Sequence, residues 1–136
     1  MGLQMTKSDL YKKGDAMRRS MYGDAAYEKA NNTVYGDPIM RKFLDVATET
    51  VFGALWTRPG LDTKTRALIC VVSDIATARE EELAIHIRFA IGQGWTEDEL
   101  LETMLHLSGY IGVPSVRGAM LVAKRVFAEM KEEISE

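Results

Sequence analysis

Signals for the beginnings and ends of helices recur along this chain, and they constrain its fold more than any other feature. An Asp-Pro pair at residues 37–38, and Thr96 with Glu99 three residues later, predict helix starts. Asp and Thr cap free backbone amides, and Pro is tolerated in the first turn. Gly23 and Gly53 follow helical segments and predict their ends. No period-2 run bounded by turn residues predicts a convincing strand, so we expect an all-α protein of six to seven helices.

The spacing of apolar residues places these helices along one continuous domain. No repeat, low-complexity segment or long linker interrupts the chain, so we treat residues 1–136 as a single domain. Apolar residues on most sides of the segment 62–78 predict a central buried helix. A domain of this size usually gains stability by oligomerising. We expect helices over about residues 7–21, 24–31, 38–52, 62–78, 80–93, 96–109 and, after a turn at 112–115, to about residue 133.

Composition excludes several classes of protein. The chain is 46% hydrophobic and 27% charged, as in ordinary globular proteins. A formal net charge of -3 provides no basic field for nucleic acid or an anionic membrane. The apolar stretches are too short to span a bilayer, and the N-terminal residues lack the apolar core of a signal peptide. Cys70 is the single cysteine, which rules out an intramolecular disulfide and fits a reducing compartment. We therefore expect a soluble cytoplasmic protein with neither a nucleic acid nor a membrane as its partner.

The segment with the most chemistry is REEELAIHIRFAIGQG, residues 79–94. On a helix, Glu82 and His86 lie four residues apart and project from the same face. A carboxylate and an imidazole so placed can exchange a proton. A Glu and a His four residues apart on a helix are more often a structural or surface pair than a catalytic one, so the spacing alone does not establish a site. A metal site of Glu82, His86 and His106 lacks the spacing of known metal motifs, so we expect no metal.

Four further residues are candidates for binding a ligand. Arg58 lies in a Pro-Gly loop beside Trp56, and Arg66 follows on the next helix. Arginine suits a carboxylate ligand because its planar fork donates two parallel hydrogen bonds. Tyr110, between two glycines, offers a hydroxyl group. Two alternatives to ligand binding stay open: Arg58 could be a solvated loop residue, and Tyr110 could pack in the core.

Three segments taken together resemble one known family. WTRPGLDTKTRALI at 56–69, REEELAIHIRFAIGQGWTEDELLE at 79–102 and HLSGYIGVPSVRGAM at 106–120 are similar to the consecutive signatures of gamma-carboxymuconolactone decarboxylases. The N-terminal segment YKKGDAMRRSMYGDA also resembles the start of those enzymes. The similarity covers nearly the whole chain. Residues 27–52 match only loosely, and the loop at 31–38 has no assigned role.

The resemblance implies an alkyl hydroperoxidase D-like helical fold that assembles into homo-oligomeric rings, as trimers or hexamers. It also implies a pocket near subunit contacts and no cofactor. The family reaction removes CO2 from 4-carboxymuconolactone and leaves 3-oxoadipate enol-lactone, in the beta-ketoadipate pathway of aromatic catabolism. The electrons that CO2 leaves behind delocalise into the conjugated lactone carbonyl, so the substrate is its own electron sink. The protein must orient the small lactone acid, stabilise an oxyanion and deliver a proton to carbon.

Family position and this chemistry together assign roles to the candidates. The resemblance implies that His86 is the proton donor or oxyanion partner and that Glu82 orients it; both form the catalytic pair. It does not decide which of the two carries the proton. For substrate binding it implies a carboxylate clamp of Arg58 and Arg66, a pocket wall of Trp56 and a polar contact from Tyr110.

Three alternatives to this function stay open. Alkyl hydroperoxidase D proteins carry a CxxC pair ahead of the histidine, and those positions are Arg79 and Glu82 here. Without the dithiol, a thiol peroxidase has no electron donor. The same fold could instead act on another keto or lactone acid, or serve as a non-catalytic binding or assembly protein.

Overall fold

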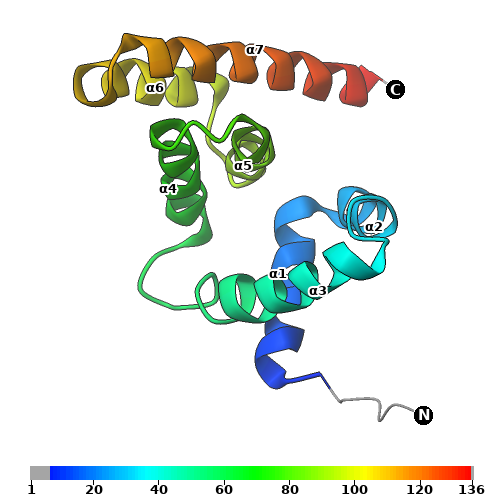
Figure 1. Cartoon of the computed structure of the whole chain (residues 1–136). Helices are drawn as coiled ribbons and strands as arrows, with labels where there is room; N and C mark the ends of the chain where they lie inside the picture. The colour runs from blue at the N-terminus through cyan, green and yellow to red at the C-terminus, as the bar shows by residue number, and fades with distance from the viewer. Residues whose placement is uncertain (1–6, 136) are drawn as a thin grey trace. The chain divides into compact units, whose positions relative to one another are not determined.

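The structure is a computed structural model that describes residues 7–135 and contains seven α-helices and one π-helix, with no strand in that range (Figure 1). The all-α prediction is therefore confirmed. None of the helices in this range is long and apolar enough to cross a bilayer. Residues 1–6, on which the expected absence of a signal peptide partly rests, lie outside the described residues. The chain divides into two compact units, Met1–Leu61 and Asp62–Glu136.

The first unit contains α1 (Asp9–Tyr22), α2 (Asp24–Asn32), α3 (Pro38–Ala47) and the π-helix η1 (Thr48–Gly53). The Asp37 carboxylate accepts hydrogen bonds from the backbone amides of Ile39 and Met40, which confirms the predicted helix start. The sequence predicts one helix over 38–52. The chain stays helical there but widens to a π-helix after Ala47.

Glycines allow α1 to pack closely on η1. A Cβ atom at Gly14 would lie 2.0 Å from the carbonyl oxygen of Thr48 and 2.7 Å from the backbone nitrogen of Gly53. A Cβ atom at Gly53 would lie 2.3 Å from the carbonyl oxygen of Leu10. Any larger residue at either position would push the two backbones apart. The glycine at the predicted helix end thus serves this close contact as well.

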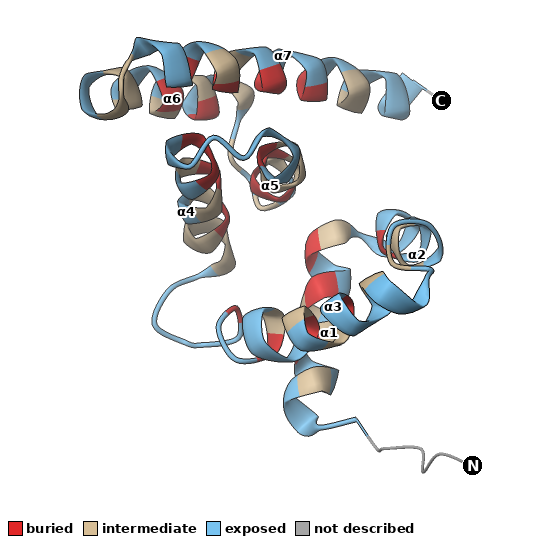
Figure 2. Cartoon of the chain, in the orientation of Figure 1, coloured by how far each residue is buried: buried red, intermediate tan, exposed pale blue. Residues whose placement is uncertain are grey.

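The second unit contains α4 (Thr63–Ala76), α5 (Glu80–Gly92), α6 (Glu97–Ile111) and α7 (Val113–Ser135). The predicted capping box of α6 is present: the Thr96 hydroxyl accepts from the Glu99 amide, and the Glu99 carboxylate accepts from the Thr96 amide. α5 packs against both α4 and α7, and α6 packs along α7. Figure 2 shows the buried residues gathered on one side of α7. The fully buried core residues of this unit include Ala67, Val71, Ile87, Ala90, Leu100, Met104, Ala123 and Val126.

The prediction that α4 is buried on most sides is wrong. Its buried residues are Ala67, Val71, Asp74 and Ile75, which share one face, whereas Ile69 is 51% exposed. Within this unit α4 packs chiefly against α5 and to a smaller extent against α7.

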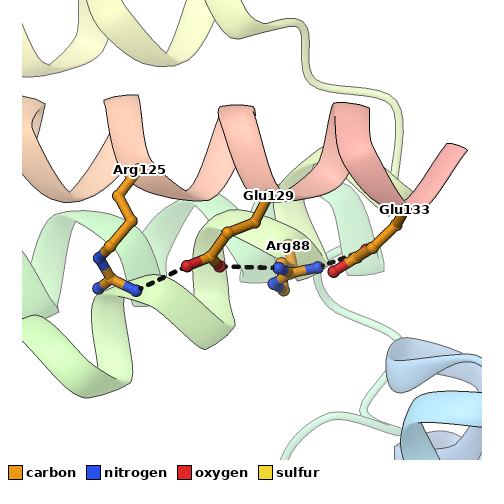
Figure 3. A network of polar contacts seen from close by, with 4 residues as sticks. All are labelled: Arg88, Arg125, Glu129 and Glu133. Atoms are coloured by element: carbon orange, nitrogen blue, oxygen red, sulfur yellow. Dashed lines mark hydrogen bonds and ion pairs between the residues drawn. The ribbon is translucent and has the colours of Figure 1, made fainter. Parts of the chain in front are cut away.

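A chain of charges links α5 to α7 (Figure 3). The Arg88 guanidinium donates to Glu133 at 2.9 Å and to Glu129 at 3.1 Å, and Arg125 donates to Glu129 at 3.3 Å. The hydrogen bond to Glu133, followed by that to Glu129, raises the pKa of Arg88. This network fixes the exposed edge of α5 against the C-terminal part of α7.

Candidate active site

The imidazole of His86 is held by a buried carboxylate, that of Asp74. The His86 Nδ1 atom lies within hydrogen-bonding distance of the Asp74 Oδ2 atom. Because an ionised carboxylate only accepts, Nδ1 carries the hydrogen of this bond. Asp74 is 6% exposed and His86 is partly buried, so solvent screens the pair weakly. The other ring nitrogen, Nε2, is then left to act on a ligand.

A tight turn between α4 and α5 brings the two residues together. Ala78 occupies the left-handed region with φ 57°, which is uncommon for a residue other than glycine. The Arg79 amide donates to the carbonyl oxygen of Asp74 at 2.9 Å, which closes the turn. The chain then reverses and α5 packs against α4. The Phe89 and His86 rings pack in a T-shaped arrangement, with ring centroids 5.4 Å apart, which restricts the orientation of His86.

Asp74 also lines a pocket at the junction of α4, α5 and α7. The pocket has a volume of about 280 Å³. Its polar lining residues are Asp74, Arg79, Glu80 and Ser115, and the remainder of the wall is mostly apolar. Apolar walls with a few convergent polar groups are typical of small-molecule sites. The strained residue Ala78 also lines this pocket, and strained backbone clusters at functional sites.

Cys70 lies one turn before Asp74 on α4 and is half-buried. Burial and the negative charge of Asp74 raise the pKa of the Cys70 thiol to about 11. At neutral pH the thiol is protonated, and a protonated thiol is a poor nucleophile. Cys70 therefore contributes a neutral side chain beside the carboxylate.

The sequence model of one protein family matches residues 41–125, which include α4, α5, α6 and all of the site residues just described. The chain belongs to the carboxymuconolactone decarboxylase family. It is similar to a 4-carboxymuconolactone decarboxylase of Acinetobacter baylyi, with 32% identity over 93% of this chain and 92% of that protein. It is also similar to a nitrosuccinic acid decarboxylase of Metarhizium robertsii, with 34% identity over 91% of this chain and 85% of that protein.

Besides His86, three of the site residues predicted from the sequence lie in the second unit, each in a different environment. Glu82 is exposed on α5, and the carboxylate that contacts the His86 ring is that of Asp74. Arg66 is half-buried on α4. Tyr110 is 76% exposed near the end of α6, and its ring packs against that of His106, with ring centroids 5.3 Å apart. The roles assigned to these residues in catalysis and binding stay predictions.

Two predicted binding residues belong to the first unit of the chain. Trp56 is buried and stacks on Phe52, with ring centroids 5.9 Å apart. Arg58 is exposed in the loop that follows η1, and its amide donates to the carbonyl oxygen of Leu55 at 3.1 Å. The loop predicted from the Pro-Gly signal is therefore present, and the proposed contacts of Trp56 and Arg58 with substrate stay predictions.

Asp74 is a candidate site residue that was not predicted from the sequence. The available signal was an acidic residue in the otherwise apolar run at residues 67–76, because a charge in such a run needs a buried partner. Among residues 7–135, no group of three His, Cys, Asp or Glu side chains is arranged to hold a metal ion.

Proposed function

We propose that this protein is a decarboxylase of a small lactone acid, 4-carboxymuconolactone or a close relative. Its family and the activity named for its relative from Acinetobacter baylyi support the reaction class. The observation that carries the proposal is the contact of the His86 imidazole with the buried carboxylate of Asp74, which itself lines a partly apolar pocket.

The reaction requires a proton for carbon. The bond between the ring carbon and the carboxylate breaks, CO2 leaves, and the electron pair moves through the conjugated system onto the lactone carbonyl oxygen. The Nε2–H of a protonated His86 then donates its proton to the resulting dienolate, which becomes the enol-lactone. Solvent returns a proton to the imidazole. In this scheme no cofactor accepts electrons, because the substrate carbonyl does.

Asp74 contributes by its charge and by its position. Its carboxylate fixes the imidazole through Nδ1 and stabilises the imidazolium form that must donate. Because Asp74 is buried, this interaction is stronger than it would be in water. Asp74 is thus proposed as the residue that orients the imidazole of His86 and stabilises its protonated form. The sequence had assigned the orienting role to Glu82.

Arg79 is the basic residue in the pocket lining and provides the local attraction for a carboxylate substrate. Its guanidinium suits a carboxylate by the same two-point geometry expected of Arg58 and Arg66. The neighbouring Glu80 and Asp74 repel a second carboxylate placed on their side of the pocket. We propose that Arg79 binds the carboxylate that stays on the product. The other carboxylate leaves as neutral CO2, and an ion pair with arginine would oppose that loss of charge.

A direct assay tests the proposal. Purified protein is mixed with 4-carboxymuconolactone without added cofactor, and CO2 release and loss of lactone absorbance are followed. His86→Ala should reduce kcat by about 10²- to 10⁴-fold, as expected for loss of a general acid. Because the variant also leaves the buried Asp74 without its partner, its thermal midpoint should fall, and activity is measured at a temperature at which circular dichroism shows the variant to be folded. Exposed His106→Ala is the matched control and should keep wild-type turnover. Full activity of His86→Ala would reject the assignment.

A nitro-substituted dicarboxylic acid is the second candidate substrate, because the relative from Metarhizium robertsii is named for that chemistry. A nitro group beside the departing carboxylate can accept the electron pair as a lactone carbonyl does, so His86 could protonate the carbon in either case. Measuring kcat/KM for nitrosuccinate and for 4-carboxymuconolactone under the same conditions separates the two. The preferred substrate should exceed the other by at least a factor of about 100, which corresponds to about 2.7 kcal/mol.

Assembly into a homo-oligomer of three or six chains is also part of this proposal. Light scattering of the purified chain measures its mass directly, and a purely monomeric protein with full activity would reject assembly as a requirement.

A further inference from the structure

A guanidinium group is buried in the first unit, far along the sequence from the residues discussed above. Arg18 on α1 is 1% exposed. Its Nη1 atom donates to the side-chain oxygen of Asn31 at 2.7 Å. The rings of Tyr22, Tyr27 and Tyr35 surround the guanidinium carbon at 5.0, 4.9 and 5.2 Å. α1, α2 and the turn before α3 thus together enclose one positive charge.

The second terminal nitrogen of this group is not satisfied. The Nη2 atom of Arg18 is buried and has no hydrogen-bond partner among residues 7–135. Aromatic faces attract the charge but accept its N–H groups only weakly. A buried donor without a partner loses its hydration without compensation, and the penalty is larger for a charged group. Such an atom in a native structure calls for an explanation.

The charges nearby do not supply the missing acceptor. The Asp15 carboxylate accepts the Tyr27 hydroxyl at 2.5 Å, and no carboxylate in the described part of the chain lies within 4.0 Å of Arg18. A second guanidinium is close: Arg41 Nη2 donates to the backbone oxygen of Asn31 at 3.4 Å. Asn31 therefore receives one arginine on its side chain and another on its backbone. Among the described residues, neither Arg18 nor Arg41 has a carboxylate within 4.0 Å.

We propose that Arg18 and Arg41 form a binding site for a small oxyanion, a carboxylate or a phosphate. One oxygen of the anion accepts from the free Nη2 of Arg18, and the charge of Arg41 adds to the attraction. Carboxylates and phosphates match a guanidinium because two of their oxygens can accept parallel, charge-assisted hydrogen bonds from its N–H groups. Neither arginine lines the pocket that Asp74 lines, and the proposed anion site does not depend on the proposed reaction.

Entry of the anion requires one of the enclosing rings to move. Tyr22 and Tyr27 are fixed on α1 and α2, whereas Tyr35 lies in the turn between α2 and α3. Tyr35 is partly exposed, and its amide donates to the carbonyl oxygen of Ala30 at 3.0 Å. Tyr35 also stacks on Phe43, with ring centroids 6.4 Å apart, so a binding anion that displaces this ring would break that stacking. This gives the loop at 31–38 a role that the sequence left open.

The test uses the full-length protein in inorganic phosphate and, separately, in acetate, each titrated at constant ionic strength with chloride as the balancing ion. Calorimetry measures binding, and the thermal midpoint measures stabilisation. We expect saturable binding of at least one of the two anions, and the effective one identifies the oxyanion. Arg41→Gln should weaken the affinity about tenfold by removing one charge, and Arg18→Met should abolish the binding.

Matched controls distinguish this site from others. Arg117→Gln removes an exposed arginine on α7 and should bind the anion as the wild type does. His86→Ala should also bind normally, so failure of the proposed reaction would leave this result unaffected. If Arg18→Met does not fold, the anion affinity of Arg41→Gln alone tests the proposed site. The proposal is overturned if neither anion binds saturably, or if the Arg41→Gln affinity equals that of the wild type.

Discussion

Replacement of Asp74 by asparagine isolates the contribution of one carboxylate to the action of His86. Asparagine keeps the size of the side chain but removes the negative charge that faces Nδ1. The side chains of the pair are 8% exposed for Asp74 and 20% exposed for His86, so little of the interaction is screened by solvent. A hydrogen bond to a charged group contributes about 1.5–3 kcal/mol. If that stabilisation is needed to form the proton donor, kcat should fall by about 10- to 150-fold.

The assay is turnover of 4-carboxymuconolactone at saturating concentration, with the thermal midpoint of each variant as a check on folding. Glu82→Gln is the matched control, because Glu82 is exposed and its carboxylate is not the one that contacts His86. It should keep kcat within about twofold of the wild type, as expected for a surface substitution. In the His86→Ala background, Asp74→Asn should add no further loss, since the two residues act as a unit.

The reverse pattern would refute this reasoning. If Glu82→Gln lost activity while Asp74→Asn kept it, the sequence-based assignment of Glu82 would be correct and the Asp74 contact would have only a structural role. Independent, additive losses from Asp74→Asn and His86→Ala would also show that Asp74 does not act through His86.

Three further predictions follow from the local structure. Burial and Asp74 raise the pKa of the Cys70 thiol from 9.0 to about 11, so at pH 8 it should react with iodoacetamide about 100-fold more slowly than an unperturbed thiol. Because the thiolate is the reactive form, the rate should rise about tenfold per pH unit until the pKa is reached; a rate independent of pH would contradict the shift. Gly14→Ala places a Cβ atom 2.0 Å from a carbonyl oxygen and should lower the free energy of unfolding by about 3 kcal/mol or more in urea denaturation. The control Gly60→Ala, where no atom lies within 4 Å, should change it by less than about 1 kcal/mol, and equal effects would show that η1 can shift. Arg88→Met should cost about 0.5–1 kcal/mol, less at 1 M salt, because Glu129 and Glu133 are 43% and 57% exposed; a loss independent of salt would mean that packing, not charge, holds α5 on α7.

Sequence alone determined the helical content and most helix boundaries of this protein. Caps depend on side chains within three residues of the amides that they satisfy, so local sequence specifies them. The predicted start at Asp37 and the capping box of Thr96 and Glu99 are both present. Family membership was also evident, because the segments that carry it are contiguous in sequence.

The tertiary structure alone decided which carboxylate meets His86. Helical spacing favoured Glu82, four residues away on the same helix, but side chains on one helix both point outward from it. Asp74 lies twelve residues away and on another helix, and it reaches the imidazole because the turn at Ala78 folds α5 back onto α4. The same holds for Arg18, whose enclosure by three tyrosines depends on how α1, α2 and a turn pack. Periodicity describes one helix at a time, whereas burial of a charge and its choice of partner arise only when helices meet.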